Sequence, residues 1–130
     1  MIIRSLDEIA GTERDVSGPG WRSRRILLRK DGMAHSLHFT EVPAGTEMRL
    51  WYKVHLEANL VITGAGEVED VATGEVHQIG PGSLYALDRN DRHILRAHTD
   101  LQLVCVFTPA LTGGETHDAD GSYLLAADDD

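Results

Sequence analysis

The chain has 130 residues and a mass of 14.3 kDa, the size of one ordinary domain, which leaves no room for a second catalytic domain. Hydrophobic residues make up 42% and charged residues 25% of the chain, which is typical of globular proteins and excludes a disordered chain. Twelve basic and twenty-one acidic residues give a net charge of −9, which disfavours binding to nucleic acids and to anionic membranes.

The N-terminal fifteen residues contain no apolar stretch long enough for a signal peptide or a membrane span. A single cysteine, Cys105, excludes an internal disulfide, and no spacing typical of zinc ligands surrounds it. These features predict a cytoplasmic protein. We expect one domain over residues 1–130, with about residues 121–130 partly disordered because the chain ends in three aspartates.

The predicted elements begin with a short strand at Ile2–Ile3 and a short helix after it. Ser5 and Glu8 have the S-x-x-E spacing of a helix capping box. From Arg25 onward, strand-like segments alternate with turn residues, at 25–29, 34–42, 46–54, 56–62, 67–71, 75–79, 83–87, 93–97 and 101–107. Because no long amphipathic segments separate them, the pattern favours an all-β barrel or sandwich over a parallel sheet with crossover helices.

One segment resembles the first motif of the cupin superfamily, whose two motifs place metal ligands inside a double-stranded β-helix, a jelly-roll barrel. The motif has the form G-x5-H-x-H-x3-E-x6-G. Gly45, Glu57 and Gly64 match it, whereas Trp51 and Lys53 occupy the two histidine positions. Two of the usual metal ligands are therefore absent, and Glu57 stays as a candidate ligand.

A second segment resembles the other cupin motif, G-x5-P-x-G-x2-H. Gly82 and His93 match it, and Asn90, which tolerates a positive φ, stands in a glycine position. Strand alternation predicts that Tyr85 approaches His93 across a hairpin and that both converge with Glu57 inside the barrel. Two oxygen donors and one imidazole suit iron(II) better than a thiolate-favouring zinc site.

A purely structural interpretation of this trio stays open. In that interpretation Glu57 pairs with Lys53 or Arg49, Tyr85 is a core residue and His93 is a hydrogen-bonded turn residue. The metal-binding interpretation has a physical advantage, because a carboxylate inside a barrel costs several kcal/mol unless it is paired or coordinated.

Longer segments of the chain resemble the ectoine synthase family of cupins over nearly the whole length. They are DGMAHSLHFT, PAGTEMRLWYKVHLEA, GAGEVEDVATGEVHQI, PGSLYALDRNDRHILRA, LQLVCVFTPALTGGETHD and DGSYLL. The resemblance implies an iron-dependent homodimer that converts N-γ-acetyl-L-2,4-diaminobutyrate to ectoine, a compatible solute made under osmotic stress, with loss of water. It also implies that the metal ligands are Glu57, Tyr85 and His93. The family's substrate-pocket positions fall on Trp21, Arg25, Thr40, Tyr52, His55, Cys105, Phe107, Glu115 and His117.

The reaction accounts for these residue types, because an amine must attack the carbonyl carbon of a poorly electrophilic amide. A Lewis-acidic metal would polarise that carbonyl, and Arg25 would clamp the substrate carboxylate. Trp21 or Phe107 would exclude water, since hydrolysis competes. Glu115 and His117 would exchange protons with the amine and the departing oxygen, which requires a lid-like C-terminal tail folded over the barrel mouth.

Several of these residues have a structural alternative. Trp21 could plug the barrel end, Arg25 could be a surface charge, and Thr40 an ordinary strand residue. Cys105 is by default a small core residue. Tyr52 has the opposite strand parity to Glu57 and needs a bulge or another route to the site. The chain also departs from the family at Val54, in the polar ANL after Glu57, and at Leu124.

Two other functions compete with this interpretation. A cupin dioxygenase or isomerase would need a histidine-rich site, which Trp51 and Lys53 disfavour. A non-catalytic cupin that binds a small molecule is the main alternative, and it has no need for three converging metal ligands.

Overall fold

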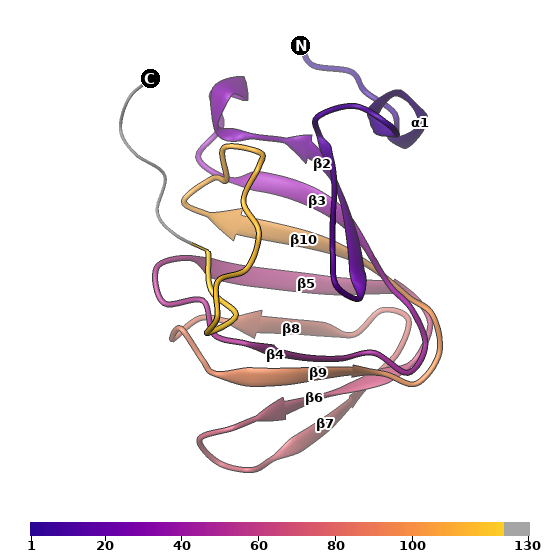
Figure 1. Ribbon diagram of the computed structural model, residues 1–130, viewed down its shortest axis with the longest axis vertical. Helices are drawn as coiled ribbons and strands as arrows, with labels where there is room; N and C mark the ends of the chain where they lie inside the picture. The colour runs from indigo at the N-terminus through magenta and orange to yellow at the C-terminus, as the bar shows by residue number, and fades with distance from the viewer. Residues whose placement is uncertain (124–130) are drawn as a thin grey trace.

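The computed structural model describes residues 1–123 and is built almost entirely of strands (Figure 1). A short helix α1 (Leu6–Ile9) and a 3₁₀ turn η1 (Arg29–Asp31) are its helical elements. The strands are β1 (Asp15–Gly18), β2 (Trp21–Leu27), β3 (Ser36–Val42), β4 (Glu47–Leu50), β5 (Leu56–Thr63), β6 (Gly66–Asp70), β7 (Val76–Ile79), β8 (Leu84–Leu87), β9 (His93–Ala97) and β10 (Leu101–Thr108). No helix within residues 1–123 is long and apolar enough to cross a membrane.

The strands form two antiparallel sheets that enclose a common interior. The larger sheet has the order β1-β2-β3-β10-β5-β8, and the smaller has the order β4-β9-β6-β7. Strand alternation directs side chains inward: Leu101, Leu103, Cys105 and Phe107 of β10 are all buried. The predicted all-β class, the barrel and the short N-terminal helix are confirmed.

The N-terminal region differs from the prediction in two elements. The Ser5 hydroxyl accepts a hydrogen bond from the Glu8 amide at 3.2 Å, which confirms the predicted helix cap. The predicted strand at Ile2–Ile3 is wrong: both side chains are exposed and the segment is irregular. Strand β1, which pairs with β2, was not predicted because its sequence, DVSG, carries little hydrophobic signal.

The predicted strand over 46–54 ends at Leu50, and residues 51–55 form a loop. The Asn90 side-chain amide holds this loop by donating to the carbonyl oxygens of Tyr52 and His55, at 3.1 and 3.2 Å. Asn90 has a φ of +53°, which confirms its expected left-handed conformation. Because strand alternation does not apply in a loop, Tyr52 turns inward and is buried despite its parity.

The C-terminal segment, residues 109–123, crosses in front of β10 and β5 in the view of Figure 1. It is attached to the 51–55 loop: the Trp51 amide donates to the Gly121 carbonyl at 3.0 Å, and Lys53 pairs with Asp120 at 2.6 Å. Gly121 has a φ of +77°, and a Cβ at this position would lie 2.3 Å from the Arg49 carbonyl oxygen. Ser122 is buried. Residues 124–130, which include Leu124 and most of the predicted disordered tail, lie outside the described residues.

The Asp31 carboxylate links the N-terminal segment to the hairpin formed by β2 and β3. Asp31 accepts hydrogen bonds from Arg4 at 2.9 Å, Arg14 at 3.0 Å and the Leu28 amide at 2.9 Å, and its side chain is 8% exposed. The Arg4 guanidinium is the main reason that the pKa of Asp31 lies well below its ordinary value of 3.8. A lowered pKa adds stability above pH 3.8, and that stability is lost as the pH falls below it.

We therefore expect Asp31→Asn to lower the free energy of unfolding at pH 7 by about 2 kcal/mol. The difference from the unmodified chain should shrink steadily below pH 3.8. Urea unfolding at several pH values measures both effects. Asp7→Asn, at an exposed site in α1, is the matched control and should change stability little. A deficit that persists unchanged at pH 2 would contradict the ion-pair explanation.

Candidate active site

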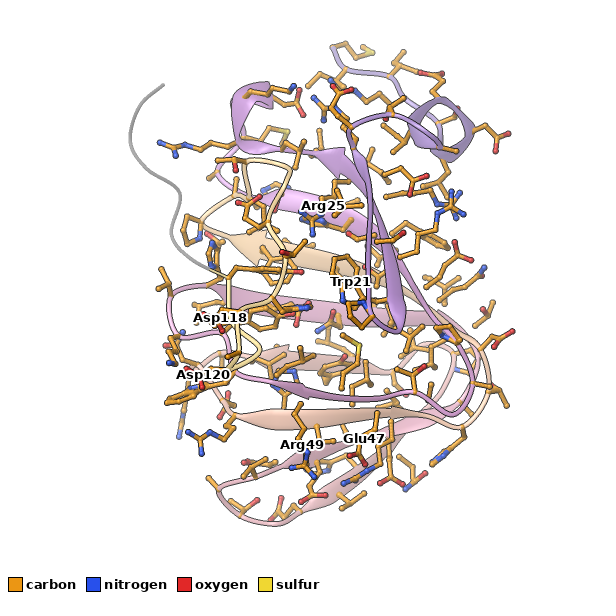
Figure 2. The ribbon with its side chains drawn as sticks, in the orientation of Figure 1. Trp21, Arg25, Glu47, Arg49, Asp118 and Asp120 are labelled. Atoms are coloured by element: carbon orange, nitrogen blue, oxygen red, sulfur yellow. The ribbon has the colours of Figure 1, made fainter. Side chains whose placement is uncertain are left out.

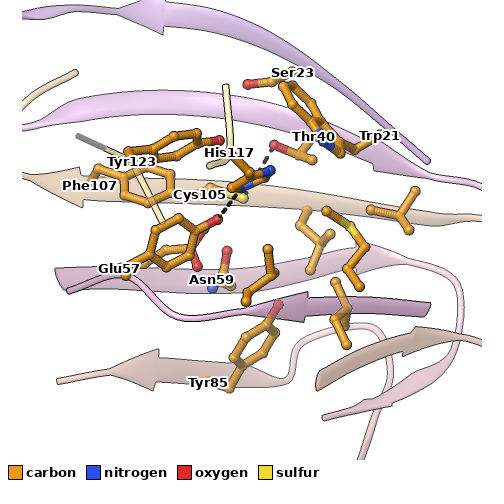
Figure 3. Close-up of a pocket in the computed structure, with 16 residues that line it drawn as sticks. Trp21, Ser23, Thr40, Glu57, Asn59, Tyr85, Cys105, Phe107, His117 and Tyr123 are labelled. Atoms are coloured by element: carbon orange, nitrogen blue, oxygen red, sulfur yellow. Dashed lines mark hydrogen bonds between the residues drawn. The ribbon is translucent and has the colours of Figure 1, made fainter. Parts of the chain in front are cut away.

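A cavity lies inside the barrel between the two sheets (Figure 3). The larger sheet contributes most of its wall, the smaller sheet closes the opposite side, and the C-terminal segment covers one end. The lining residues that carry polar or aromatic groups are Trp21, Ser23, Thr40, Tyr52, Glu57, Asn59, Tyr85, Cys105, Phe107, His117 and Tyr123.

Glu57 lies on the wall of this cavity, on β5, with 8% of its surface exposed. Burial raises the pKa of its carboxyl to about 8, because the charged form loses its hydration. Lys53 pairs with Asp120, and Arg49 pairs with Glu47. Asp120, Arg49 and Glu47 lie on the outside of the molecule (Figure 2). The alternative in which Glu57 pairs with Lys53 or Arg49 is therefore wrong.

Tyr85 and His93 approach one another, with ring centroids 6.5 Å apart. The predicted hairpin between them is wrong: β8 belongs to the larger sheet and β9 to the smaller, so the two rings meet across the barrel interior. Burial, together with the charge of Glu57, holds the pKa of Tyr85 well above its ordinary value. The inward alternation of strand residues thus brings Glu57 and Tyr85 to one wall of the cavity and His93 beside Tyr85.

The hydrogen bonding of His93 defines its tautomer. Nδ1 lies 3.0 Å from the Asp91 carbonyl oxygen, which can only accept, so Nδ1 carries the hydrogen. Burial lowers the pKa of the ring, which is therefore neutral and has a lone pair on Nε2. Nε2 is buried and makes no hydrogen bond in the described part of the structure. A lone pair with no donor partner suits a metal ligand.

The donor set Glu57, Tyr85 and His93 therefore fits a metal ion that accepts oxygen and imidazole ligands. No group of three or more His, Cys, Asp and Glu side chains within residues 1–123 lies close enough to hold a metal. A site at this position consequently needs the Tyr85 oxygen as its third donor. Trp51 and Lys53, at the histidine positions of the first cupin motif, stay outside the cavity, and the Trp51 ring packs against Lys53 and Arg92.

Arg25 is fully buried on β2, so the surface-charge interpretation is wrong (Figure 2). Its guanidinium donates to the Gly113 carbonyl at 3.0 Å and to the Ser23 hydroxyl at 3.3 Å, whereas Nη2 has no hydrogen-bond partner among the described residues. The nearest carboxylate oxygen, on Glu115, is 3.9 Å away. A buried guanidinium with one unused N–H donor favours the binding of an anionic ligand, because the anion would both neutralise the charge and accept the hydrogen bond.

Buried hydrogen bonds extend from Arg25 along β2 and β3. His38 bridges two hydroxyls, with Ser23 at 3.2 Å from Nδ1 and Ser36 at 2.8 Å from Nε2. Burial and the charge of Arg25 lower the pKa of His38 to about 3, so the ring is neutral. These hydrogen bonds fix the position of the Ser23 hydroxyl, which accepts the hydrogen bond from the Arg25 guanidinium.

His117 reaches the cavity from the C-terminal segment, as the predicted tail over the barrel requires. Its Nε2 lies 2.8 Å from the Tyr52 hydroxyl, and its ring stacks on Tyr123 with centroids 4.5 Å apart. The Trp21 ring contacts it edge-on at 5.3 Å. Burial and the charge of Arg25 lower the pKa of His117 to about 4, so the imidazole is neutral at pH 7.

Glu115 does not line the cavity. Its carboxylate oxygens accept hydrogen bonds from the amides of Thr112 and Gly113, both at 2.7 Å. Burial alone would raise the pKa of Glu115, but these hydrogen bonds outweigh it and the pKa is lowered. Both carboxylate oxygens of Glu115 are therefore engaged outside the cavity, 3.9 Å or more from the Arg25 guanidinium.

The remaining predicted residues lie in or beside the cavity. Cys105 donates to the Thr40 hydroxyl at 3.4 Å, and burial raises the pKa of its thiol far above the ordinary value, which favours a packing role. Phe107 follows Cys105 on the inner face of β10. His55 is buried beyond Phe107, with ring centroids 6.2 Å apart, and its Nδ1 makes no hydrogen bond within residues 1–123.

Three polar or aromatic lining residues were not predicted: Ser23, Asn59 and Tyr123. Parity could have identified the first two, because Ser23 lies between Trp21 and Arg25 on one face of β2, and Asn59 shares a face with Glu57. No local pattern indicates Tyr123, whose position depends on the docking of the C-terminal segment.

Comparison with known proteins gives consistent matches. The family model described as ectoine synthase matches residues 1–127. L-ectoine synthase from Desulfosudis oleivorans is 58% identical over 126 residues, covering 96% of this chain and 98% of that protein. The crystal structure of ectoine synthase from P. lautus has a TM-score of 0.87 and 48% identity, covering 100% of this chain and 96% of that chain.

A more distant structure supports the fold alone. A cupin 2 conserved barrel domain protein from Salinispora arenicola has a TM-score of 0.67 at 19% identity, covering 83% of this chain and 88% of that chain. The predicted cupin barrel is confirmed.

Proposed function

The chain belongs to the ectoine synthase family and is therefore a hydro-lyase that forms ectoine. We propose that it does so by cyclising N-γ-acetyl-L-2,4-diaminobutyrate, with iron(II) as cofactor. The observation that carries the metal proposal is the buried His93 Nε2, which has no hydrogen-bond partner within residues 1–123. Its ring lies beside Tyr85, with centroids 6.5 Å apart, and Tyr85 is close enough to Glu57 for the charge of that carboxylate to raise its pKa. These three side chains would hold the ion. When bound, it would supply Lewis-acid polarisation of the acetamide carbonyl.

The ring closure is balanced without any other reactant. The α-amine nitrogen forms a bond to the acetamide carbon, the carbon–oxygen bond breaks, and both hydrogens of the neutral amine leave with that oxygen as water. The protein must therefore fold the substrate so that amine and carbonyl meet, and it must move protons between them. Such proximity contributes about 7 kcal/mol or more in favourable intramolecular reactions.

Arg25 is the group best suited to orient the substrate. Its unpartnered Nη2 donor would bind the α-carboxylate, while Ser23 and Gly113 hold the rest of the guanidinium in place. Trp21 and Phe107 line the cavity and would exclude water from the amide, which limits hydrolysis. Thr40, Tyr52, His55 and Cys105 would complete the substrate-binding surface by shape and hydrogen bonding.

His117 is the proposed proton carrier, because it lines the cavity and is neutral. The ring could take a proton from the amine and return it to the departing oxygen. Glu115 lies 3.9 Å from the Arg25 guanidinium, and both of its carboxylate oxygens accept backbone hydrogen bonds. It would therefore affect the reaction by positioning Arg25.

Two matched variants separate these roles. We expect His117→Gln to lower kcat by about 10²-fold or more, which is the usual contribution of a general acid–base group. Glu115→Gln should raise KM by about tenfold and leave kcat nearly unchanged, because only the support of Arg25 is weakened. Steady-state kinetics measure both. A kcat for Glu115→Gln as low as that for His117→Gln would assign proton transfer to Glu115.

The proposed function is tested by ectoine formation from N-γ-acetyl-L-2,4-diaminobutyrate, using purified metal-free protein with and without added iron(II). We expect ectoine only in the iron-containing reaction. Folded, iron-loaded protein that binds the compound without converting it would favour the alternative, a non-catalytic cupin that binds small molecules.

The physiological setting follows from the same premise. The chain would work as one cupin domain over residues 1–130, in the cytoplasm, where ectoine protects cells against osmotic stress. Its partner is the small-molecule substrate. The charge of −9 makes nucleic acid and anionic membranes unsuitable partners.

A homodimer is supported by the outer face of the larger sheet. Leu56, Leu60 and Ile62 of β5 are 38–41% exposed, and Leu84 of β8 is 66% exposed. These side chains point away from the cavity, and β8 is the last strand of its sheet. Exposed apolar side chains on adjacent strands are typical of a protein interface, and a second copy of the chain is the occupant proposed here.

Light scattering after gel filtration should give a mass of about twice 14.3 kDa. We expect Leu60→Glu to shift it toward that of one chain, because each interface would bury an unpaired charge. Val76→Glu, at a similarly exposed position on β7 of the other sheet, is the control and should keep the dimer mass. A single-chain mass for the unmodified protein would refute the dimer.

A further inference from the structure

Asn59 is a polar residue on the wall of the cavity that none of the roles above uses. It lies on β5 close to Glu57 (Figure 3). Only 1% of its surface is exposed. Its cross-strand neighbours are Tyr85 on β8 and Cys105 on β10. The amide is therefore surrounded by residues of the candidate site.

The Nδ2 donor of Asn59 has no hydrogen-bond partner in the described structure. The amide lies near enough to Glu57 to favour its charged form, but Nδ2 makes no hydrogen bond of good geometry with it. Leaving such a donor unpaired and buried destabilises a protein, and native structures rarely tolerate it without a reason. An apolar residue would fill this strand position without that cost.

The chemistry around Asn59 restricts the ligand group that could satisfy it. An amide N–H must donate, so it cannot bind an ammonium group. Glu57 would be charged when it holds the metal and would then repel a ligand carboxylate, for which Arg25 is the proposed partner. Among the groups of the proposed substrate, the neutral acetamide carbonyl oxygen is the remaining acceptor. This oxygen becomes more negative during amine attack, so a donor beside it favours the transition state.

We infer that the Asn59 amide is an additional substrate-binding group that donates a hydrogen bond to the acetamide oxygen of the substrate. The inference rests on the proposed function, since it takes its ligand from that reaction. It assigns Asn59 a role in ligand binding and not in the stability of the fold.

The test compares Asn59→Leu, which keeps the shape but removes the donor, with Asn59→Thr, which keeps a hydroxyl donor. Thr63→Val, on the same strand but exposed, is the control for loss of a polar group. Four quantities are measured: iron per chain, Tm of the metal-free protein, the rise in Tm caused by substrate, and steady-state kinetics.

We expect Asn59→Leu to lower kcat/KM by about 10²-fold, the usual effect of losing one such donor. Iron content should be unchanged, the substrate-induced rise in Tm should shrink, and the Tm without ligand should rise by about 3 °C because an unpaired donor is gone. Asn59→Thr should lose only about tenfold, and Thr63→Val should behave like the unmodified chain.

Three results would overturn the inference. Unchanged kcat/KM in Asn59→Leu shows that the donor is not used. A fall in Tm of several degrees with normal kinetics assigns Asn59 to the fold, and loss of iron together with activity assigns it to the support of Glu57. Absence of ectoine formation by the iron-loaded unmodified chain instead refutes the proposed function, and the inference with it.

Discussion

Replacing Glu57 by glutamine is expected to abolish iron binding and to lower ectoine formation by about 10³-fold or more. The variant keeps the shape of the side chain but removes the only carboxylate of the proposed ligand set. Tyr85 and His93 would be left as two neutral groups, and a tyrosine oxygen binds a metal well only when it is deprotonated. Iron per chain and the rate of ectoine formation are the measurements.

The metal-free proteins give an independent check that the variant is folded. The pKa of Glu57 is raised from 4.5 to about 8, so the folded state favours the protonated carboxyl. The unmodified metal-free chain should therefore lose stability as the pH rises from about 4.5 to 8. Glutamine does not titrate, so metal-free Glu57→Gln should be the more stable protein above pH 8 and nearly equal at pH 4.

The matched control is Glu67→Gln, a carboxylate on β6 that pairs with Arg96 outside the cavity. It should retain iron and activity. Full iron content in Glu57→Gln would exclude Glu57 as a ligand, and retained iron with lost turnover would give Glu57 a role in catalysis without metal binding.

The second large effect is expected at Arg25. Arg25→Met should lower kcat/KM by about 10²–10³-fold, because the substrate carboxylate loses a charge-assisted partner in a buried site. Arg25→Lys keeps the charge but lacks the forked donors, so we expect a loss of about 10²-fold. Most of both losses should be in KM, since the carboxylate is bound before and during the reaction.

Arg24→Met is the matched control, because Arg24 is the next residue on β2 but faces outward and pairs with Glu41 at 2.9 Å. Its kinetics should match those of the unmodified chain. A substrate that lacks the α-carboxylate provides a second check: it should react at similar rates with the unmodified chain and with Arg25→Met. A large difference between them for that substrate would mean that Arg25 supports the fold of the site and does not bind the carboxylate.

The strands that carry Glu57, Cys105 and Phe107 can be predicted from sequence because their pattern is local. Along β5 and β10, buried residues alternate with more exposed ones because successive side chains of a strand point to opposite faces, which predicts that Glu57, Cys105 and Phe107 face the interior. The spacing of Glu57 and His93 in the two cupin motifs and the resemblance to the ectoine synthase family supplied the candidate ligands.

The same local reasoning failed where the chain leaves regular structure. Strand alternation gives Tyr52 the wrong parity, but Tyr52 belongs to a loop that the Asn90 side chain holds from another part of the chain. The approach of Tyr85 to His93 was expected within one hairpin, whereas the two strands lie in different sheets. Alternation predicts which face a side chain occupies, and does not predict which sheet lies opposite.

The all-β barrel, the family and the inward direction of most site residues can be predicted without coordinates, because they depend on periodicity and on motifs that are contiguous in the chain. The environment of Arg25 and the position of His117 depend instead on contacts between distant segments. Arg25 is buried because Gly113, 88 residues further along, accepts its hydrogen bond, and His117 reaches the cavity because its segment docks on the 51–55 loop. Burial and the pKa values that follow from it depend on such distant contacts, which no local pattern encodes.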